Sequence, residues 1–314
     1  MLSERRLGEA VTPDEADLEG VVRRVDGWRG RDVRYAMLVG GLNNRNWRVR
    51  VEDDPRSYFV KVPGKGSEMF VDRVAANEAA RNAHAVGLGP EVVFFDPADG
   101  VEIAEFLEGY QACTNADFQD AEVQSAVIGI YRTLHAGPPL SLTKTVFDMI
   151  DEHFDQARSL GSHLPEDFAW LAHQYRRAKA AMTAAGIDLV PCFNDPMPGN
   201  FLVGGEGSMR LIDYEFASNN ERAYELGVLF AEMFYDEAVT MSLIEQYYGV
   251  GRTDMFARVM VCRSLADLKW ATWAIVTRKL TDWDFDYQKY GVWKYMRARD
   301  LMHDPRWDGW LRSV

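Results

Sequence analysis

Residues 193–202 constrain the fold of this chain more than any other segment, because they place polar side chains at a fixed spacing between two short apolar runs. Asp195 and Asn200 form an Asp-x4-Asn pattern, and Asp213 follows Asn200 by thirteen residues in a segment that also contains Glu215. Asp213 and Glu215 should project to the same side of an extended segment, since side chains alternate along a strand. Alone, Asp-x4-Asn is common, and a loop aspartate that caps a helix is its ordinary interpretation. The combination favours one shared site.

The spacing matches the catalytic loop of protein kinases, H-R-D-L-x-x-x-N, and its metal-binding aspartate farther along the chain. Phosphoryl transfer needs a carboxylate that orients the acceptor hydroxyl and takes its proton. It also needs oxygen ligands that hold Mg²⁺ on the nucleotide phosphates. The sequence therefore predicts Asp195 and Asn200 as the catalytic pair, with Asp195 contacting the acceptor. Asn200, Asp213 and Glu215 are the predicted metal ligands.

The region before residue 109 contains the residues predicted to bind the nucleotide. Lys61 lies in a strand-like run, like the kinase lysine that contacts the α- and β-phosphates, and Glu78 is placed on the next helix to pair with it. The run at residues 40–44 would cover the phosphates, because glycines expose backbone N–H groups and permit close approach. By itself this run could also be a hairpin turn. The predicted nucleotide-binding residues are Gly40, Gly41, Leu42, Asn43, Asn44, Lys61, Glu78, Glu105 and Leu107.

The distribution of patterns along the chain predicts an α+β fold with two lobes. Thr12, Pro13 and Glu15 form a helix start with a capping box, and we expect that helix to run to about Gly27. Strand-like runs and one helix follow up to residue 105, and helical patterns dominate after residue 109. We therefore expect a small antiparallel-sheet lobe at residues 1–108 and a larger, mostly helical lobe at residues 109–314. The expected strands are 33–37, 47–51, 58–62, 92–95 and 101–105, and the expected helix between them is 71–85.

Charge and cysteine content exclude several classes of protein. The chain has 35 Lys and Arg against 48 Asp and Glu, a formal net charge of −13. Nucleic acid and anionic membranes are held by basic surfaces, so neither is expected as a partner, whereas a cationic small molecule suits the charge. Cys113, Cys192 and Cys262 are too scattered for a disulfide framework or a zinc site, which favours the cytoplasm. We expect neither a signal peptide nor a membrane span.

Taken together, the motifs resemble the choline/ethanolamine kinase family within the aminoglycoside phosphotransferase superfamily, whose fold is similar to that of protein kinases. The Gly-Gly-Leu-x-Asn run at residues 40–44 resembles the choline kinase branch, as does Ile-Asp-Tyr-Glu-Phe-Ala at residues 212–217. The similarity continues through Glu225-Leu226-Gly227 and covers roughly residues 35–300. It implies ATP and Mg²⁺ as cofactors and a small alcohol as the phosphate acceptor.

The resemblance also implies an acceptor pocket. Choline and ethanolamine kinases carry W-x-x-W on a late helix and a tyrosine seventeen residues later, which matches Trp270, Trp273 and Tyr290. An aromatic box beside a carboxylate attracts a quaternary ammonium by about 2 kcal/mol or more when the site is desolvated. Glu232 and Glu237 would supply the negative charge. Tryptophans at i and i+3 share one helix face, so ordinary packing is the alternative interpretation.

Two positions depart from the family pattern. Phe193 stands where related kinases have a histidine that supports the catalytic loop by hydrogen bonding, so it must support the loop by packing. Glu237 aligns with a tyrosine expected to complete the pocket, which leaves a more acidic and less aromatic box. Such a change could favour ethanolamine, with its N–H donors, or another cationic alcohol.

Three interpretations of function remain open at this stage. The first is an ATP- and Mg²⁺-dependent kinase that phosphorylates the hydroxyl of choline or ethanolamine. The second is a kinase of the same superfamily that acts on an aminoglycoside, thiamine, a sugar or homoserine. The third is a pseudokinase, and competent residues at all the predicted catalytic and metal positions argue against it. The sequence leaves the oligomeric state undetermined.

Overall fold

A computed structural model describes residues 4–38, 44–64, 69–281 and 285–314 of the chain. The chain divides into two compact units, each built from two separate segments. Unit 1 contains Met1–Ala112 and Leu202–Glu215, and unit 2 contains Cys113–Phe201 and Phe216–Val314. The sequence analysis predicted one boundary at residue 108. In the structure the first segment of unit 1 ends at Ala112, and residues 202–215 also belong to unit 1, which was not predicted.

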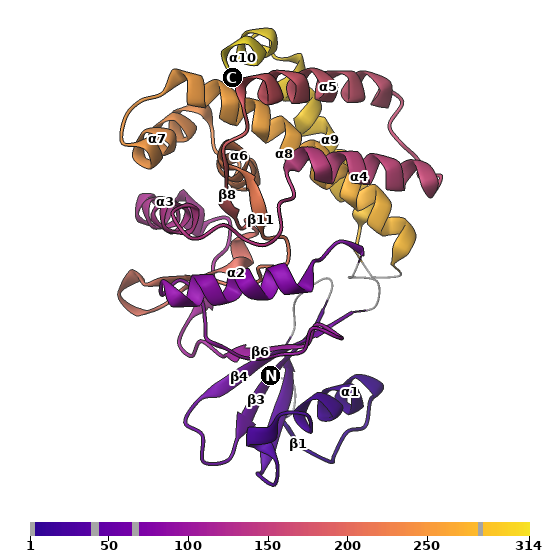
Figure 1. Ribbon diagram of the computed structural model, residues 1–314, viewed down its shortest axis with the longest axis vertical. Helices are drawn as coiled ribbons and strands as arrows, with labels where there is room; N and C mark the ends of the chain where they lie inside the picture. The colour runs from indigo at the N-terminus through magenta and orange to yellow at the C-terminus, as the bar shows by residue number, and fades with distance from the viewer. Residues whose placement is uncertain (1–3, 39–43, 65–68, 282–284) are drawn as a thin grey trace. The chain divides into compact units, whose positions relative to one another are not determined.

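Unit 1 is built around a six-stranded antiparallel sheet with the strand order β1-β2-β3-β4-β6-β5 (Figure 1). A second sheet, of order β10-β9-β7, joins the two segments of the unit, with Ala112 of β7 opposite Leu202 of β9. The elements of the two sheets and their helices are β1 (Arg5–Arg6), α1 (Pro13–Val22), η1 (Asp26–Trp28), β2 (Val33–Leu38), β3 (Asn44–Val51), β4 (Ser57–Pro63), α2 (Arg73–Ala85), β5 (Val92–Phe95), β6 (Glu102–Glu105), β7 (Gln111–Ala112), β9 (Phe201–Val203), η5 (Gly205–Gly207) and β10 (Met209–Leu211).

Alternating side chains decide which face of the main sheet is buried. In β3, Trp47, Val49 and Val51 are buried while the arginines between them are not, which is the period of two expected for a half-buried strand. Leu18 and Val22 of α1 belong to the same hydrophobic core. Helix α1 begins with the predicted capping box, which is confirmed, but it ends at Val22 and not near Gly27. Backbone hydrogen bonds that span three residues, such as the bond from Val25 N–H to Val22 O, end the helix there and lead into η1.

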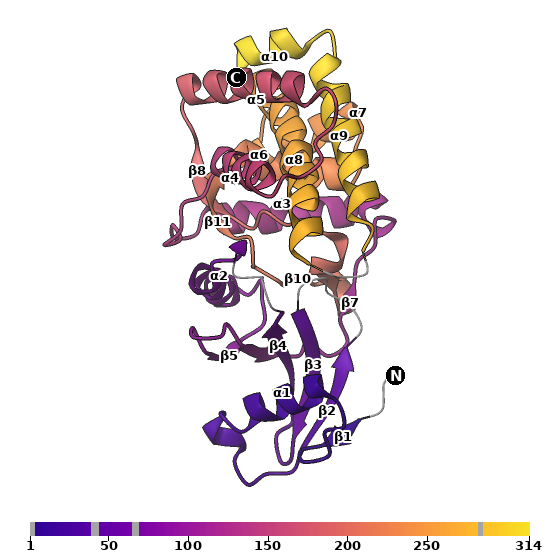
Figure 2. The same cartoon turned by 90° about the vertical axis from the view of Figure 1, so that its right-hand side faces the viewer.

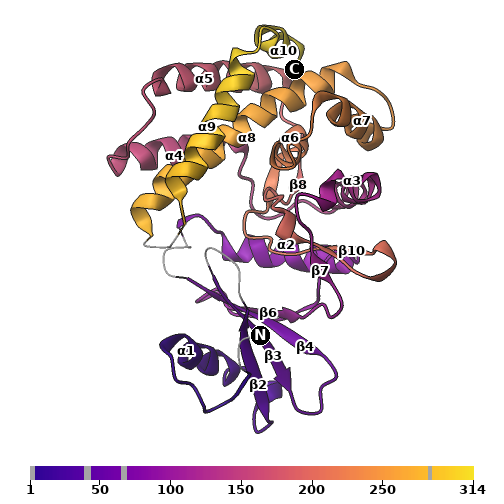
Figure 3. The same cartoon turned by 180° about the vertical axis from the view of Figure 1, so that it is seen from behind.

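Unit 2 is mostly helical and contains one short antiparallel pair, β8 with β11. Its elements are η3 (Asp117–Gln119), α3 (Ala121–His135), α4 (Val146–Ser159), α5 (Phe168–Ala185), β8 (Leu189–Cys192), η4 (Pro198–Asn200), β11 (Ser218–Glu221), α6 (Arg222–Glu232), α7 (Glu237–Tyr248), α8 (Thr253–Leu280), α9 (Tyr287–His303) and α10 (Trp307–Ser313). Figures 2 and 3 show α9 running beside α8. The predicted antiparallel sheet and helical region are both confirmed.

Helix α8 is the centre of unit 2, and it packs against α4, α6 and α9. A glycine allows α6 to approach it closely: a β-carbon on Gly227 would lie 2.9 Å from the backbone nitrogen of Arg263. Any other residue would therefore push the two helices apart. Although α8 is long and largely buried, no helix within the described part of the chain has a stretch apolar and long enough to span a membrane.

Candidate active site

Lys61 and two carboxylates lie together in unit 1. Val60 of β4 faces the core, so the alternation of the strand turns Lys61 to the opposite face. The Lys61 ammonium lies 3.4 Å from Asp213 Oδ1 and 3.4 Å from Glu215 Oε1. Asp213 and Glu215, which the sequence predicted to project to the same side of one segment, thus both form ion pairs with the lysine predicted to bind phosphate.

The charges of this group depend on one another. Burial alone would lower the pKa of Lys61, but Glu215 and Asp213 outweigh it and hold that pKa above its usual range. Burial, and then the neighbouring Glu215 carboxylate, raise the pKa of Asp213. The Asp213 side chain is 38 % exposed and that of Glu215 only 8 %, so Asp213 is the carboxylate more open to a ligand. A crowded carboxylate pair of this kind is relieved when a cation binds.

The donor atoms of the group suit a magnesium ion. Asn44 Nδ2 donates to Glu215 Oε1 over 2.7 Å, while Asn44 Oδ1 is buried and has no hydrogen-bond partner within the described residues. Asp213 adopts a left-handed backbone with φ of 67°, which aspartate tolerates better than most residues. Carboxylate and amide oxygens are the ligands that Mg²⁺ prefers. The residues present therefore fit the predicted metal.

The other predicted nucleotide-binding residues are also in unit 1. Glu78 lies in α2, Glu105 is the last residue of β6, and Leu107 follows it in a half-buried position. The pairing of Glu78 with Lys61 stays a prediction, as do the roles of Glu105 and Leu107. Gly40, Gly41, Leu42 and Asn43 lie outside the described residues, and Asn44, the last residue of that run, begins β3.

The Asp-x4-Asn segment in unit 2 forms a closed loop between β8 and β9. Asn200 Nδ2 donates to the backbone oxygen of Asp195 over 3.1 Å and to its carboxylate Oδ2 over 3.3 Å. The Met197 amide donates to the same Asp195 backbone oxygen over 2.8 Å. The spacing of five residues is therefore what lets Asn200 reach back and orient the predicted catalytic carboxylate.

Asn194 fixes the start of this loop. It is fully buried and left-handed, with φ of 66°. Its Nδ2 donates over 2.9 Å to both Phe216 O and Ser218 Oγ, and its Oδ1 accepts a bond from Asn220 Nδ2 over 3.0 Å. These contacts connect the loop to β11 and hold a backbone conformation that few side chains adopt.

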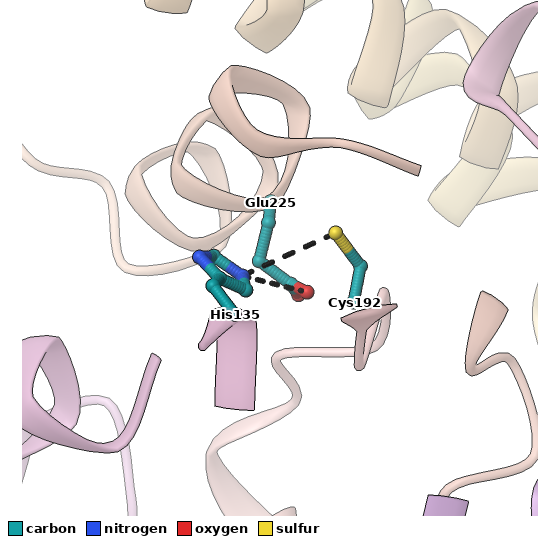
Figure 4. A group of neighbouring side chains, drawn as sticks. All are labelled: His135, Cys192 and Glu225. Atoms are coloured by element: carbon teal, nitrogen blue, oxygen red, sulfur yellow. Dashed lines mark hydrogen bonds and ion pairs between the residues drawn. The ribbon is translucent and has the colours of Figure 1, made fainter. Parts of the chain in front are cut away.

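Glu225 of α6 is a supporting residue to which the sequence analysis gave no role. Its Oε2 accepts the Phe193 backbone N–H over 2.5 Å, and its Oε1 accepts the Asn194 N–H over 2.8 Å. Figure 4 shows the Glu225 carboxylate facing His135, whose Nε2 lies 3.5 Å away. Phe193 is buried and packs edge-on against Phe201, so it supports the loop by packing, as predicted. The 31-residue separation between Glu225 and Asn194 gives no local sequence signal for this contact.

His135, Cys192 and Glu225 have ligand atoms close enough to hold a metal ion, but their chemistry argues against one. Both Glu225 oxygens already accept backbone N–H groups. Burial, and then Glu225, raise the pKa of the Cys192 thiol well above its usual range, whereas a zinc ligand must be a thiolate. We therefore assign the cluster to support of the loop that contains Asp195 and Asn200.

The aromatic residues predicted for the acceptor pocket lie together in unit 2. The Trp270 and Trp273 rings are 5.3 Å apart between centroids, and Trp273 and Tyr290 are 6.2 Å apart, both edge to face. Phe216 adjoins Trp270 at 5.2 Å, and Tyr287 adjoins Trp273 at 5.8 Å. We call these five residues the aromatic cluster. The edge-to-face geometry is that of favourable aromatic pairs.

The two predicted pocket carboxylates already have cationic partners within the protein. Glu232 accepts a hydrogen bond from Lys294 Nζ, a buried lysine of α9. Glu237 begins α7, is about half exposed, and forms two hydrogen bonds with Arg306, of 2.6 and 2.9 Å. Their negative charge is therefore largely compensated before any acceptor binds.

With this geometry in view, comparison with known proteins gives the family. The family model for choline/ethanolamine kinases matches residues 35–249, which is well over half of the chain. The chain belongs to the choline/ethanolamine kinase family. It is accordingly a small-molecule kinase, and the kinase-like fold predicted from the sequence is confirmed.

Individual relatives match over most of their length. The chain is 22 % identical to probable choline kinase 2 of Arabidopsis thaliana, with 91 % of this chain and 89 % of the relative covered. It is 23 % identical to ethanolamine kinase 1 of Mus musculus, covering 85 % and 84 %. A solved choline/ethanolamine kinase family protein from Mesorhizobium loti has a TM-score of 0.79 at 25 % identity, covering 96 % and 98 %. Solved macrolide and aminoglycoside phosphotransferases share the fold.

Proposed function

We propose that this kinase transfers the γ-phosphoryl group of ATP, with Mg²⁺, to the hydroxyl of a small amino alcohol, choline or ethanolamine. The observation that carries the proposal is the group formed by Lys61, Asp213 and Glu215 in a member of this family. A partly buried lysine beside two carboxylates can bind phosphate oxygens and a metal together. We also propose a cytoplasmic location, since all three cysteines are free thiols.

In the proposed reaction, Asp195 accepts the proton of the acceptor hydroxyl as its oxygen bonds to the γ-phosphorus and ADP leaves. Asn200 orients the Asp195 carboxylate through the bond described above. Lys61 would contact the α- and β-phosphates. Asp213, Glu215 and Asn200 would hold Mg²⁺, which neutralises charge on the phosphate oxygens when bound. Asn44 and the rest of residues 40–44 would lie over the phosphates, and Trp270, Trp273, Tyr290 and Glu232 would line the acceptor pocket.

The test is the Asp195→Asn variant, assayed for ADP release with ATP, Mg²⁺ and either amino alcohol. Loss of a general base lowers kcat by about 10² or more, while nucleotide affinity should hardly change. Asp300→Asn, at an exposed position of α9, is the matched control and should behave as wild type. Wild-type turnover by Asp195→Asn would contradict the mechanism. Absence of transfer by the wild-type protein to both alcohols, with ATP bound, would overturn the acceptor class.

A further inference from the structure

Lys269 of α8 places an amino group inside the aromatic cluster. Its Nζ lies 3.0 Å from the centroid of the Trp270 ring and 4.6 Å from that of Phe216. The residue is 1 % exposed, and within the part of the chain that the structure describes its Nζ has no hydrogen-bond partner. A buried amine without a partner is costly and rare, so its presence needs an explanation.

The surroundings of Lys269 match those expected for a bound ammonium. An aromatic box for a cation consists of ring faces beside a carboxylate. Lys269 has the two ring faces, and the Asp195 carboxylate favours its charged form. Burial is the larger effect and lowers the pKa of Lys269 well below its usual range. The positive charges of Lys144 and Lys294 lower this pKa further. The Lys269 amine therefore occupies the kind of position that the quaternary ammonium of a ligand would take.

Apart from Asp195, two nearby carboxylates, Asp267 and Glu232, leave little negative charge to attract a second cation. Asp267 is buried and pairs with Arg297, and the Lys294 ammonium lies 3.6 Å from Asp267 Oδ1 while also bonding Glu232. The positive charge of α9 thus compensates both acidic groups. A cationic acceptor must then be held by something other than a free carboxylate of this group.

The cluster does offer a hydrogen-bonding oxygen. Tyr287 Oη is buried and has no partner among the described residues. A phenol oxygen can accept a hydrogen bond from a primary ammonium, which has three N–H donors. A trimethylammonium has no N–H donor and depends on ring faces and charge alone. The unpartnered Tyr287 oxygen favours a primary ammonium, and the covered face of Trp270 removes a contact that a trimethylammonium needs. Both features therefore disfavour a trimethylammonium head group.

We propose that Lys269 is a specificity-determining residue, which makes the acceptor pocket select a primary amino alcohol of the ethanolamine class over a quaternary one such as choline. The inference rests on the proposed function and on the aromatic cluster as its acceptor pocket. A charged Lys269 repels any cationic head group, and because it covers Trp270 it removes a ring face on which a trimethylammonium depends more than a primary ammonium does. An uncharged Lys269 still covers that ring, and its lone pair can accept a hydrogen bond only from an acceptor with N–H groups. Discrimination against choline follows in either protonation state.

The experiment compares kcat/KM for ethanolamine and choline in the wild-type protein and in Lys269→Met, which keeps the length of the side chain but loses the amine. We expect the wild type to prefer ethanolamine, and the choline-to-ethanolamine ratio to rise about tenfold or more in the variant, mainly through KM for choline. Lys279→Met, at an exposed position near the end of α8, should leave the ratio unchanged. Lys269→Gln gives a second variant if Lys269→Met does not fold.

A binding measurement separates this inference from the proposed function. Quenching of tryptophan fluorescence reports acceptor binding without turnover, and 3,3-dimethylbutanol serves as a neutral isostere of choline. Tighter choline binding in the folded Lys269 variants supports the inference even where neither alcohol is phosphorylated, an outcome that defeats only the proposed function. A wild-type preference for choline, or an unchanged ratio and unchanged choline binding in the folded variants, overturns the inference.

Discussion

The support that Glu225 gives to the loop of the predicted catalytic residue Asp195 can be tested by exchanging one carboxylate oxygen for an NH₂ group. In Glu225→Gln the side chain keeps its shape and one oxygen but turns an NH₂ group toward one of the two backbone N–H donors of Phe193 and Asn194. A hydrogen bond to a charged group contributes about 1.5–3 kcal/mol, and an unsatisfied buried donor costs a further 1–3 kcal/mol or so. Because the loop can relax in part, we expect the free energy of unfolding to fall by about 3 kcal/mol.

The assay is urea unfolding followed by circular dichroism, together with kcat for the folded variant. Since Asp195 directly follows Asn194, kcat should fall while KM for ATP stays near the wild-type value. Glu245→Gln, at an exposed position of α7, is the matched control and should stay within about 0.5 kcal/mol of wild type. A Glu225→Gln protein as stable as this control would refute the idea that the carboxylate holds the loop.

Two further variants test the metal group and the buried histidine. Asp213→Asn should abolish Mg²⁺-dependent transfer in a magnesium titration, whereas Asp53→Asn, an exposed aspartate with a similar left-handed φ of 60°, should not; activity retained in Asp213→Asn would remove it from the metal site. Burial, and then Lys269, lower the pKa of His153 to about 3 in the folded protein, so below pH 6.5 the unfolded chain binds a proton that the folded protein does not. The contribution of neutral His153 to the free energy of unfolding is therefore fully present above pH 6.5. As the pH falls below 6.5, the free energy of unfolding decreases by about 1.4 kcal/mol per pH unit. Urea unfolding at pH 7 and pH 5 should accordingly show a smaller acid loss in His153→Gln than in the exposed control His163→Gln, and equal losses would contradict a neutral buried His153.

Local patterns in the sequence predicted much of the fold. Alternation predicted the strands that became β2 to β6, and the capping box predicted the start of α1. The Asp-x4-Asn spacing predicted a loop that does close through Asn200 and Asp195. These signals succeed because they depend on backbone geometry over a few residues.

The contacts that were not predicted join residues far apart in the chain. Glu225 reaches Asn194 across 31 positions, and Lys294 reaches Glu232 across 62. Glu232 and Glu237 were predicted to supply the charge of an acceptor pocket, but sequence alone does not say that lysine and arginine side chains compensate that charge first. Lys269 likewise resembles any other helical lysine until the fold buries it between two rings.

The two-segment construction of unit 1 has a consequence for how the protein is made. Most of β9, all of β10 and the carboxylates that pair with Lys61 lie in Leu202–Glu215, so unit 1 cannot be completed until that segment leaves the ribosome. Cells add about 5–20 residues per second, so synthesis of residues 113–201 delays completion by on the order of ten seconds. During that interval the Lys61 strand has emerged without its anionic partners, and a chain truncated after Ala112 would remain in that unfinished state.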